Sequence, residues 1–296
     1  MHVHLRSGPA EGDTVRRRLT FVLGLTVLFA VAEAAGGWLS NSLALLADAT
    51  HMLTDVAALA LALVAAWSAR KPPNSTRTFG YRRAEILAAL LNGVALIVLA
   101  LFIFGEAWSR LRDPPEVAYG LMAVVAAGGL IVNVASAVIL RPHRSGFNVR
   151  AAYLHVLGDM LGSIGALAAA GLMAWRGWYW ADPLFSAAIG LIIVVSAVRL
   201  VLESIDVLME GAPAHLDARE IQEVLRRLAG VTGVHDLHLW SVAGDRPLLT
   251  AHLELDHSLA PGDVLRQATE TLRQRFDITH VTLQLEPPDF NIVQSL

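Results

Sequence analysis

The chain of 296 residues contains no cysteine. This absence excludes disulfide bonds, thiolate metal sites and cysteine nucleophiles, so histidine, aspartate and glutamate are the side chains left to hold a metal. Charged residues are also scarce: they make up 17% of the chain, where about a quarter is usual for a soluble domain. With a formal net charge of −3, the composition indicates no basic surface for nucleic acid.

Long apolar blocks take the place of the missing charge. Hydrophobic residues make up 55% of the chain, and the mean hydropathy is +0.52. A membrane-spanning helix needs about 20 mostly apolar residues, and six blocks reach that length before the composition becomes that of a soluble domain near residue 210. These blocks cover residues 19–39, 43–67, 84–108, 117–140, 151–175 and 183–208.

We therefore expect an α-helical membrane protein with six transmembrane helices, followed by a small α+β domain. The expected domains are an N-terminal tail over 1–18, a membrane domain over 19–209 and a cytoplasmic domain over 210–296. The first residues do not resemble a signal peptide, because the apolar block after them is too long for an h-region and no small-residue cleavage site is convincing.

Helix-breaking and aromatic residues support these blocks. Gly36-Gly37 and Asn41 are expected to break the chain between the first two helices, and Pro72-Pro73 and Pro114-Pro115 follow the second and third. Tryptophans lie near block ends, where a membrane's aromatic belts would be. They are Trp38, Trp67, Trp108, Trp175, Trp178 and Trp180.

The loops differ sharply in positive charge. One set, made of the N-terminal tail and the loops after the second and fourth helices, carries twelve lysines and arginines, whereas the opposite set carries Arg110, Arg112 and Arg176. The positive-inside rule places the first set, and with it both termini, in the cytoplasm.

The tail has short elements with soluble periodicity. Residues 216–228 and 264–276 have helical spacing with exposed charge, and residues 234–242, 248–255 and 281–285 alternate as strands. The order α-β-β-α-β predicts a small α+β sandwich with its helices on one face of the sheet.

Ionisable residues within apolar helices cost about 2.5–3.5 kcal/mol each on insertion scales and are candidates for function. Glu85 and Glu106 lie near helix ends and can reach the interface. Glu33 is deeper, and we interpret it as a protonated or hydrogen-bonded packing residue. Asp48 lines an exit path or serves helix packing.

Two pairs remain, His51 with Asp55 and His155 with Asp159. Each pair has i, i+4 spacing, which places both side chains on one face of a helix. At about 1.5 Å of rise per residue, both pairs approach the middle of the bilayer from opposite sides. A single pair is explained by a hydrogen bond within its helix, but two pairs on helices of opposite direction predict one shared metal site.

Two imidazoles and two carboxylates form a tetrahedral shell that suits Zn²⁺ and neutralises its charge. A site for Mg²⁺ or Mn²⁺ would contain more carboxylates and no imidazole. The ligands must lose protons to bind metal, and histidine titrates near physiological pH. Protons can therefore replace the metal, and a proton gradient can drive its export by alternating access.

These residues lie in segments that resemble the cation diffusion facilitator family, especially the bacterial zinc, cobalt and cadmium resistance exporters and the animal zinc transporters. The resemblance covers about residues 15–290. It rests on SNSLALLADATHMLTD, TFGYRRAEILAALLN, HVLGDMLGSIGAL, ADPLFS and VHDLHLWSV, which occur in the family's order.

The resemblance implies a homodimer, metal/proton antiport and a ferredoxin-like cytoplasmic domain. It matches the transport site to the two His-x-x-x-Asp pairs, and His51 in the first position implies a preference for zinc over cadmium. It also implies a second metal site in the cytoplasmic domain at His235, His252 and Glu286, with His238 and His280 as lesser candidates. From the sequence alone, histidines on half-exposed strands can also be ordinary surface residues.

The resemblance further implies a charge interlock between Arg83 and Glu210 that links the two domains, although both could simply face lipid head groups. Two family features are absent. The loop RKPPNSTRTF contains no His, Asp or Glu, so we expect no metal site there, and the loop RPHRSGFNVR contains only His143. His2 and His4 could collect metal weakly, but a disordered tail is the simpler expectation.

The sequence therefore predicts a zinc/proton antiporter in the bacterial inner membrane, with zinc, protons and lipid as partners. A broader exporter of Cd, Co, Ni or Fe is the alternative, and a metal sensor that does not transport is another. A membrane metalloprotease is disfavoured, because His-Glu-x-x-His is absent and four protein ligands leave no position for water.

Overall fold

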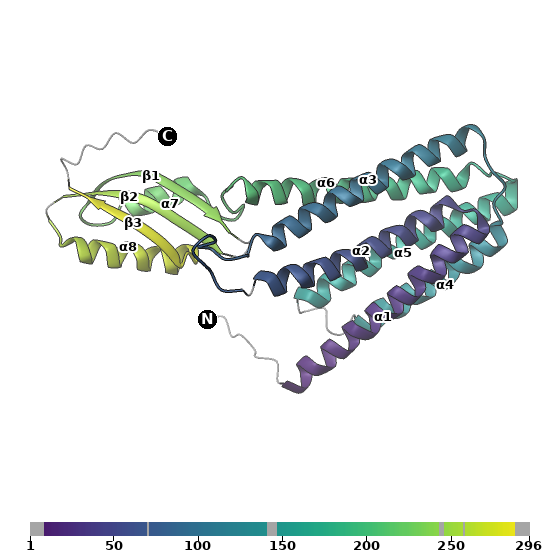
Figure 1. Cartoon of the computed structure of the whole chain (residues 1–296), viewed down its shortest axis with the longest axis horizontal. Helices are drawn as coiled ribbons and strands as arrows, with labels where there is room; N and C mark the ends of the chain where they lie inside the picture. The colour runs from purple at the N-terminus through teal and green to yellow at the C-terminus, as the bar shows by residue number, and fades with distance from the viewer. Residues whose placement is uncertain (1–8, 70, 141–146, 243–245, 257, 288–296) are drawn as a thin grey trace. The chain divides into compact units, whose positions relative to one another are not determined.

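The computed structural model describes residues 9–69, 71–140, 147–242, 246–256 and 258–287 (Figure 1). The chain forms two compact units. One comprises residues 1–61 with 92–199, and the other comprises residues 62–91 with 200–296. The second unit therefore contains the ends of three long helices together with the tail, and each unit is described by itself below.

Six long helices precede the tail, and the described part of each is apolar and long enough to span a membrane. Their order confirms the predicted six-helix class. The helices are α1 (Pro9–Ser40), α2 (Leu43–Ala69), α3 (Ala84–Arg112), α4 (Tyr119–Leu140), α5 (Phe147–Arg176) and α6 (Ala181–Leu208).

Helix α1 differs from the prediction at both ends. It begins at Pro9, so ten residues that we assigned to the tail are helical, and no strong helix breaker separates them from the apolar block. Gly36 and Gly37 lie inside the helix and do not end it. The chain turns at Asn41, whose positive φ of 56° is a left-handed conformation that asparagine tolerates.

The two glycines serve close helix packing. A Cβ on Gly36 would lie 2.6 Å from the Val125 side chain of α4, and a Cβ on Gly37 would lie 3.0 Å from Leu46 of α2. Any larger residue would therefore displace a neighbouring helix. The pair that seemed to end α1 instead allows α2 and α4 to approach it.

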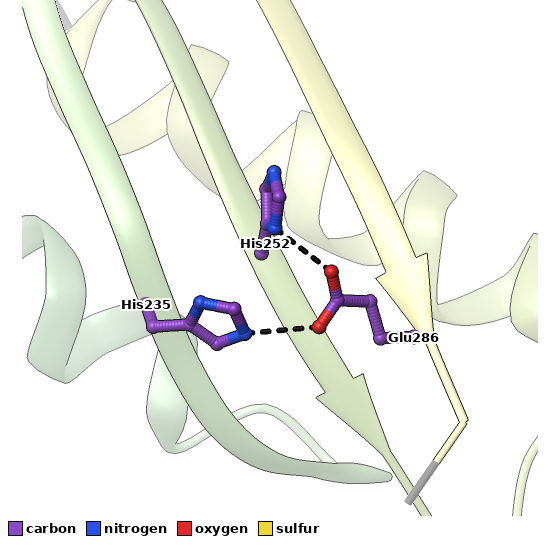
Figure 2. A group of neighbouring side chains, drawn as sticks. All are labelled: His235, His252 and Glu286. Carbon is purple, nitrogen blue, oxygen red and sulfur yellow. Dashed lines mark hydrogen bonds and ion pairs between the residues drawn. The ribbon is translucent and has the colours of Figure 1, made fainter. Parts of the chain in front are cut away.

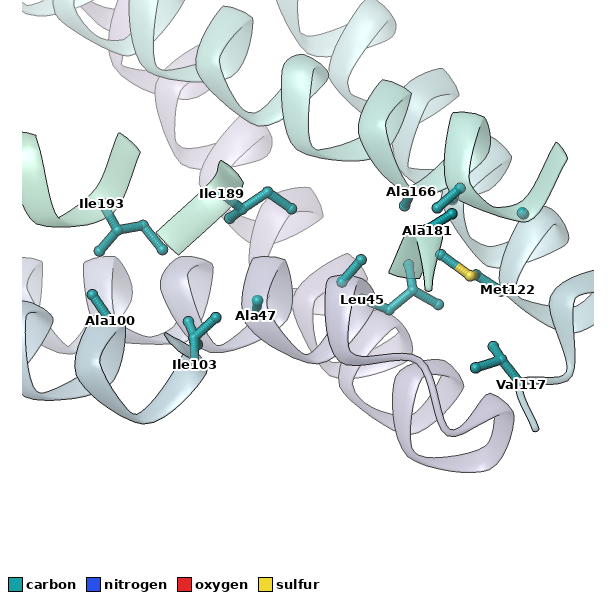
Figure 3. Packing of buried hydrophobic residues seen from close by; sticks show 14 of the residues in the cluster. Leu45, Ala47, Ala100, Ile103, Val117, Met122, Ala166, Ala181, Ile189 and Ile193 are labelled. Carbon is teal, nitrogen blue, oxygen red and sulfur yellow. The ribbon is translucent and has the colours of Figure 1, made fainter. Parts of the chain in front are cut away.

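The membrane core consists mainly of alanines interleaved with larger aliphatic side chains (Figure 3). Leu45 and Ala47 of α2 contribute to the same buried cluster as Ile103 of α3 and Ile189 of α6. Small residues let helix backbones approach closely, and van der Waals packing then holds them together in lipid. Large apolar side chains such as Phe102 and Ile131 face outward, as lipid-facing residues do.

The tail folds as helix α7 (Ala218–Arg226), strand β1 (Val231–Ser241), strand β2 (Pro247–Leu255), helix α8 (Pro261–Phe276) and strand β3 (His280–Glu286). This order confirms the predicted α-β-β-α-β arrangement. The sheet order is β1-β2-β3, with β1 and β2 antiparallel and β2 and β3 parallel. Helix α8 provides the crossover that parallel strands require.

Alternation along the strands separates a buried face from an open one. Ala251 and Leu253 pack with Ile221 of α7 and Leu272 of α8 in one core, so both helices cover the same face. His252, between those two buried residues, therefore points to the opposite face. Polar side chains of three strands can meet there.

Candidate functional site

His51 and Asp55 lie together on α2, as their spacing predicts. The His51 Nε2 atom is 3.5 Å from Asp55 Oδ2, and the side chains are 26% and 24% exposed. They are thus half-buried. An imidazole and a carboxylate on one face of an apolar helix form half of the predicted metal shell.

Asp159 lies on α5 and is buried. The backbone of His155 is helical, but its side chain lies outside the described residues. Both pairs stand eight and twelve residues after the first residue of their helices, Leu43 and Phe147. Because α2 and α5 run in opposite directions across the predicted membrane, these offsets are counted from opposite sides of it.

Asp48 shows that α2 and α5 are neighbours. Its carboxylate rests against the backbone of Gly162, where an added Cβ would lie 2.6 Å from both oxygens. The packing interpretation of Asp48 is therefore supported, and the structure does not test an exit path. The proximity of α2 and α5 is the condition that a shared site requires.

His51, Asp55 and Asp159, the predicted transport-site residues with described side chains, do not all lie within 4.8 Å of one another. In the described part of the chain, the three potential ligands that do lie this close together are in the tail. The fourth predicted ligand, His155, has its side chain outside the described residues, so the distances within the complete predicted site are not described.

Glu33 of α1 is fully buried, and neither carboxylate oxygen has a hydrogen-bond partner among the described residues. It interacts electrostatically with Asp48 and Asp159. The packing interpretation agrees with its burial, but the hydrogen-bonded form of that interpretation finds no partner in the described residues. Two further acidic side chains, Glu33 and Asp48, therefore lie near Asp159 of the predicted site.

The open face of the tail sheet brings together His235, His252 and Glu286 (Figure 2). His235 Nε2 lies 2.9 Å from Glu286 Oε2, and His252 Nδ1 lies 2.8 Å from Glu286 Oε1. The three residues come from β1, β2 and β3 respectively. His235 is paired with His252 across the antiparallel strands, and their rings are 5.1 Å apart.

A β-bulge shapes this group. The register shifts between His235 and His238, and Asp236 has a positive φ of 48°. Asp236 Oδ2 thereby lies 3.5 Å from His252 Nε2. His252 is held between two carboxylates, an arrangement that fixes the orientation of metal-binding histidines.

The electrostatics of Glu286 favour its charged form. Burial acts to raise the pKa of its carboxyl group, but hydrogen bonds from His235 and Gln284 and the nearby His252 outweigh it, so the pKa lies below its ordinary value. The carboxylate is therefore ionised near neutral pH, which is the form that a metal binds.

The lesser candidates lie outside this group. His238 Nε2 contacts Asp236 Oδ1 at 3.0 Å, and His280 is exposed at the opposite end of β3 from Glu286. Gln284 donates a hydrogen bond to Glu286 at 2.8 Å. Residues 2, 4 and 143 lie outside the described part of the chain.

Arg83 and Glu210 form the ion pair that the resemblance implied. Arg83 Nη2 donates to Glu210 Oε1 at 2.8 Å, and both side chains belong to the second unit. Among the other acidic residues, Glu85 is exposed and Glu106 pairs with Arg110 at 2.9 Å. Both therefore agree with the predicted positions near helix ends.

Sequence reasoning missed Asp182. We began the sixth block at Pro183, so this carboxylate was not counted among the ionisable residues of the membrane domain. In the structure it is fully buried in the first turn of α6 and accepts hydrogen bonds from the start of α2. Its position before Pro183, where acidic residues favour a helix start, was the available signal.

Comparison with known protein families matches the whole length of the fold. A family model described as the cation efflux transmembrane domain matches residues 19–209, and one described as the cation efflux protein cytoplasmic domain matches residues 213–288.

Individual relatives are similar over nearly the full chain. The zinc transporter ZitB of Escherichia coli is 43% identical over 96% of this chain and 91% of its own. The metal cation efflux system protein CzcD of Cupriavidus metallidurans is 42% identical over 96% of this chain and 89% of its own. The cadmium, cobalt and zinc/H(+)-K(+) antiporter of Bacillus subtilis is 42% identical over 89% of this chain and 86% of its own.

A solved structure titled "Metal-bound C-terminal domain of the CzcD transporter from Cuprividus metallidurans" is 36% identical to this chain. It covers 24% of this chain and 99% of its own, with a TM-score of 0.23.

Proposed function

Because this chain belongs to the cation efflux family, and so is an integral membrane transporter and not an enzyme, we propose that it exports Zn²⁺ from the cytoplasm in exchange for protons. Relatives named as zinc transporters and as an antiporter, each more than 40% identical, support this proposal. The observation that carries it is the neighbouring placement of α2 and α5, each with a His-x-x-x-Asp pair at the same offset.

The proposed transport site consists of His51, Asp55, His155 and Asp159. Two carboxylates neutralise the divalent ion, so the ion can occupy a site of low dielectric constant without a large net charge. The imidazoles add nitrogen ligands, which zinc accepts in a tetrahedral shell.

Protons replace the metal in the return step. Both histidines and both aspartates bind metal in their deprotonated forms, so protonation from the outer side expels the ion and prevents it from rebinding. Alternating exposure of the site to the two sides then couples zinc efflux to proton entry. Asp48 and Glu33, buried beside Asp159, add two further carboxyl groups to this region.

The chemistry of the tail supports a second, non-transported zinc. His235, His252 and Glu286 supply two nitrogens and one carboxylate oxygen at ligand spacing, and Asp236 orients His252 from behind. We propose that zinc binds here when its cytoplasmic concentration rises and that this binding regulates the transporter. We also propose that the transporter is a homodimer in the bacterial inner membrane, with both termini in the cytoplasm. The Arg83–Glu210 ion pair links the ends of α3 and α6 in this scheme.

A broader divalent exporter is the second candidate. It is favoured by relatives whose names include cadmium and cobalt. The two imidazoles at His51 and His155 disfavour hard ions such as Mg²⁺, but they do not by themselves distinguish zinc from the softer cadmium. Competition between zinc and cadmium therefore separates the two proposals.

Transport in proteoliposomes tests the primary proposal. Wild-type protein should move zinc and drive an opposite movement of protons, and Asp159→Asn should reduce both at least about 100-fold because it removes a charged ligand. Thr54→Val, one residue from Asp55 and without a ligand role, should retain most activity. Zinc flux at the wild-type rate in Asp159→Asn and Asp55→Asn would show that the site assignment is wrong.

A further inference from the structure

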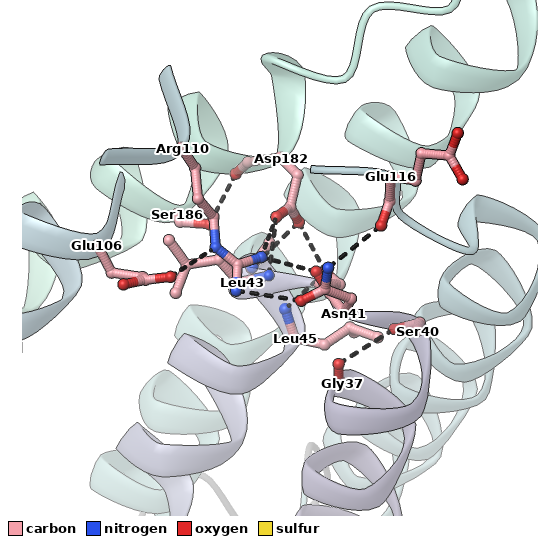
Figure 4. Close-up of polar contacts among 12 residues, drawn as sticks. Gly37, Ser40, Asn41, Leu43, Leu45, Glu106, Arg110, Glu116, Asp182 and Ser186 are labelled. Atoms are coloured by element: carbon pink, nitrogen blue, oxygen red, sulfur yellow. Dashed lines mark hydrogen bonds and ion pairs between the residues drawn. The ribbon is translucent and has the colours of Figure 1, made fainter. Parts of the chain in front are cut away.

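The start of α2 is satisfied by a residue that lies far away in sequence. The first N–H groups of a helix have no partner within it. In α2 the Leu43 N–H donates to Asp182 Oδ2 at 2.8 Å, and the Ala44 N–H donates to Asp182 Oδ1 at 3.1 Å. Asp182 belongs to α6, so the carboxylate caps the N-terminus of another helix (Figure 4).

Ser42 completes this cap from within the chain. Its Oγ accepts a hydrogen bond from the Leu45 N–H at 3.3 Å, and its hydroxyl donates to Asp182 Oδ1 at 2.7 Å. The Leu46 N–H donates to the Ser42 carbonyl oxygen at 3.3 Å. All four N–H groups of the first turn therefore have partners, two of them through Asp182.

Arg110 of α3 compensates for the negative charge of the buried Asp182 carboxylate. A buried charge is costly unless a partner compensates for it, and Asp182 is fully buried. Arg110 Nη1 lies 3.9 Å from Asp182 Oδ2 and donates to the Asn41 carbonyl oxygen at 2.7 Å. Asn41 Nδ2 in turn donates to the Glu116 carbonyl oxygen at 3.2 Å. The cap thus joins α2, α3 and α6 at one end of the first unit.

The capped end is rigidly connected to the proposed metal ligands. His51 stands eight residues after Leu43 in one continuous helix, which is about 12 Å at 1.5 Å per residue. A shift or fraying of the first turn would therefore move His51 and Asp55 relative to Asp159 on α5. A misplacement of about 1 Å at such distances is enough to weaken a reaction strongly.

From this geometry we propose that Asp182 is a positioning residue for transport. Its carboxylate fixes the axial position of α2, and through α2 it places His51 and Asp55 for zinc. The inference rests on the proposed transport role of these two ligands. It assigns Asp182 no contact with the ion, because its oxygens are engaged by the first turn of α2.

The test compares Asp182→Asn, Ser42→Ala and Asp113→Asn with wild type in proteoliposomes. Asp182→Asn retains one acceptor oxygen but loses the charge. Ser42→Ala removes one donor to Asp182 and the acceptor of the Leu45 N–H, while leaving Asp182 intact. Asp113→Asn is the matched control, since Asp113 is an exposed carboxylate just after α3. The measured quantities are KM and kcat for zinc, and the ratio of zinc to cadmium transport.

Displaced ligands should bind zinc more weakly. We expect Asp182→Asn to raise KM about tenfold and to lower the zinc to cadmium ratio, Ser42→Ala to change both in the same direction by a smaller factor, and Asp113→Asn to match wild type. A purely structural role would reduce the amount of folded protein and kcat, with KM and the metal ratio unchanged. That result in both Asp182→Asn and Ser42→Ala would overturn the inference.

The two proposals fail separately. If Asp159→Asn abolishes transport while Asp182→Asn keeps the wild-type KM and metal ratio, the transport site stands and the positioning role is wrong. If Asp159→Asn transports zinc normally, the transport site is misassigned, and the proposed positioning role of Asp182 is wrong as well. Ser42→Ala removes a single hydroxyl and keeps the inference testable if Asp182→Asn does not elute as a folded species.

Discussion

His252 is the residue on which the tail site depends most. Its Nδ1 faces Glu286 at 2.8 Å and its Nε2 faces Asp236 at 3.5 Å, so one ring nitrogen is available to a metal while the other is oriented by a carboxylate. This arrangement fixes the tautomer of a metal-binding histidine. His280, at the other end of β3, is exposed.

We therefore predict that zinc binds the tail through His252. Residues 210–296 have their own hydrophobic core, so this segment can be studied alone. His252→Ala should weaken zinc binding by at least about 100-fold, because it removes a direct ligand whose second-shell partners alone account for about 10–100-fold. Isothermal titration calorimetry measures this, with His280→Ala as control. Equal affinities in the two variants would refute the site.

At the level of elements, glycines allow α5 to pack closely against its neighbours. Gly162 and Gly158 are one turn apart on the same helix. A Cβ at Gly162 would lie 2.6 Å from the Asp48 carboxylate of α2, whereas a Cβ at Gly158 would meet open space. Of these two glycines, Gly162 is therefore the one that lies in the close contact between α2 and α5.

The pair supplies a matched test of this contact. Gly162→Ala should destabilise the protein by about 1–3 kcal/mol through overpacking. Gly158→Ala should be neutral or stabilising by up to about 1 kcal/mol, since alanine favours helix over glycine. Thermal unfolding in detergent measures both. A Gly162→Ala variant as stable as Gly158→Ala would mean that α2 and α5 do not approach as closely as described.

In the whole molecule, the membrane helices and the tail have separate cores. The buried cluster of the helices and that of the tail share no residue among those described. The Arg83–Glu210 ion pair joins the start of α3 to the chain just after α6. Because its side chains are 38% and 61% exposed, the pair contributes at most about 1 kcal/mol to stability. We therefore expect its importance to lie in coupling the start of α3 to the chain after α6.

Charge reversal tests that coupling. Arg83→Glu and Glu210→Arg should each slow zinc transport several-fold with little change in melting temperature, because each places like charges together. The double variant restores an opposite pair in swapped order and should recover most of the rate. Arg82→Glu serves as control for charge at the same loop. If the double variant is as slow as the singles, the two residues do not act as a pair.

Much of this architecture could be predicted from the sequence because its signals are local. Six apolar blocks and the alternating strands of the tail need only periodicity, and the spacing of His51 and Asp55 places them on one helical face without knowledge of other helices. The two histidines and the glutamate of the tail could be named only through the family resemblance, since they come from three strands.

What the sequence could not supply depends on contacts between distant segments. Gly36 and Gly37 have the local signature of a helix end, yet packing against Val125 and Leu46 keeps them helical. Asp182 lies at a block boundary, where an acidic residue is unremarkable, and its importance depends on its position against α2. The β-bulge at Asp236 likewise follows from strand register and not from residue type.

The cap on α2 also has a consequence for the order of synthesis. Leu43 and its partner Asp182 are 139 residues apart, and a ribosome adds about 5–20 residues per second. For roughly 7–28 s after the start of α2 has been made, its first N–H groups must wait for a carboxylate that does not yet exist. The cap on α2 therefore cannot form until the last transmembrane helix has been made.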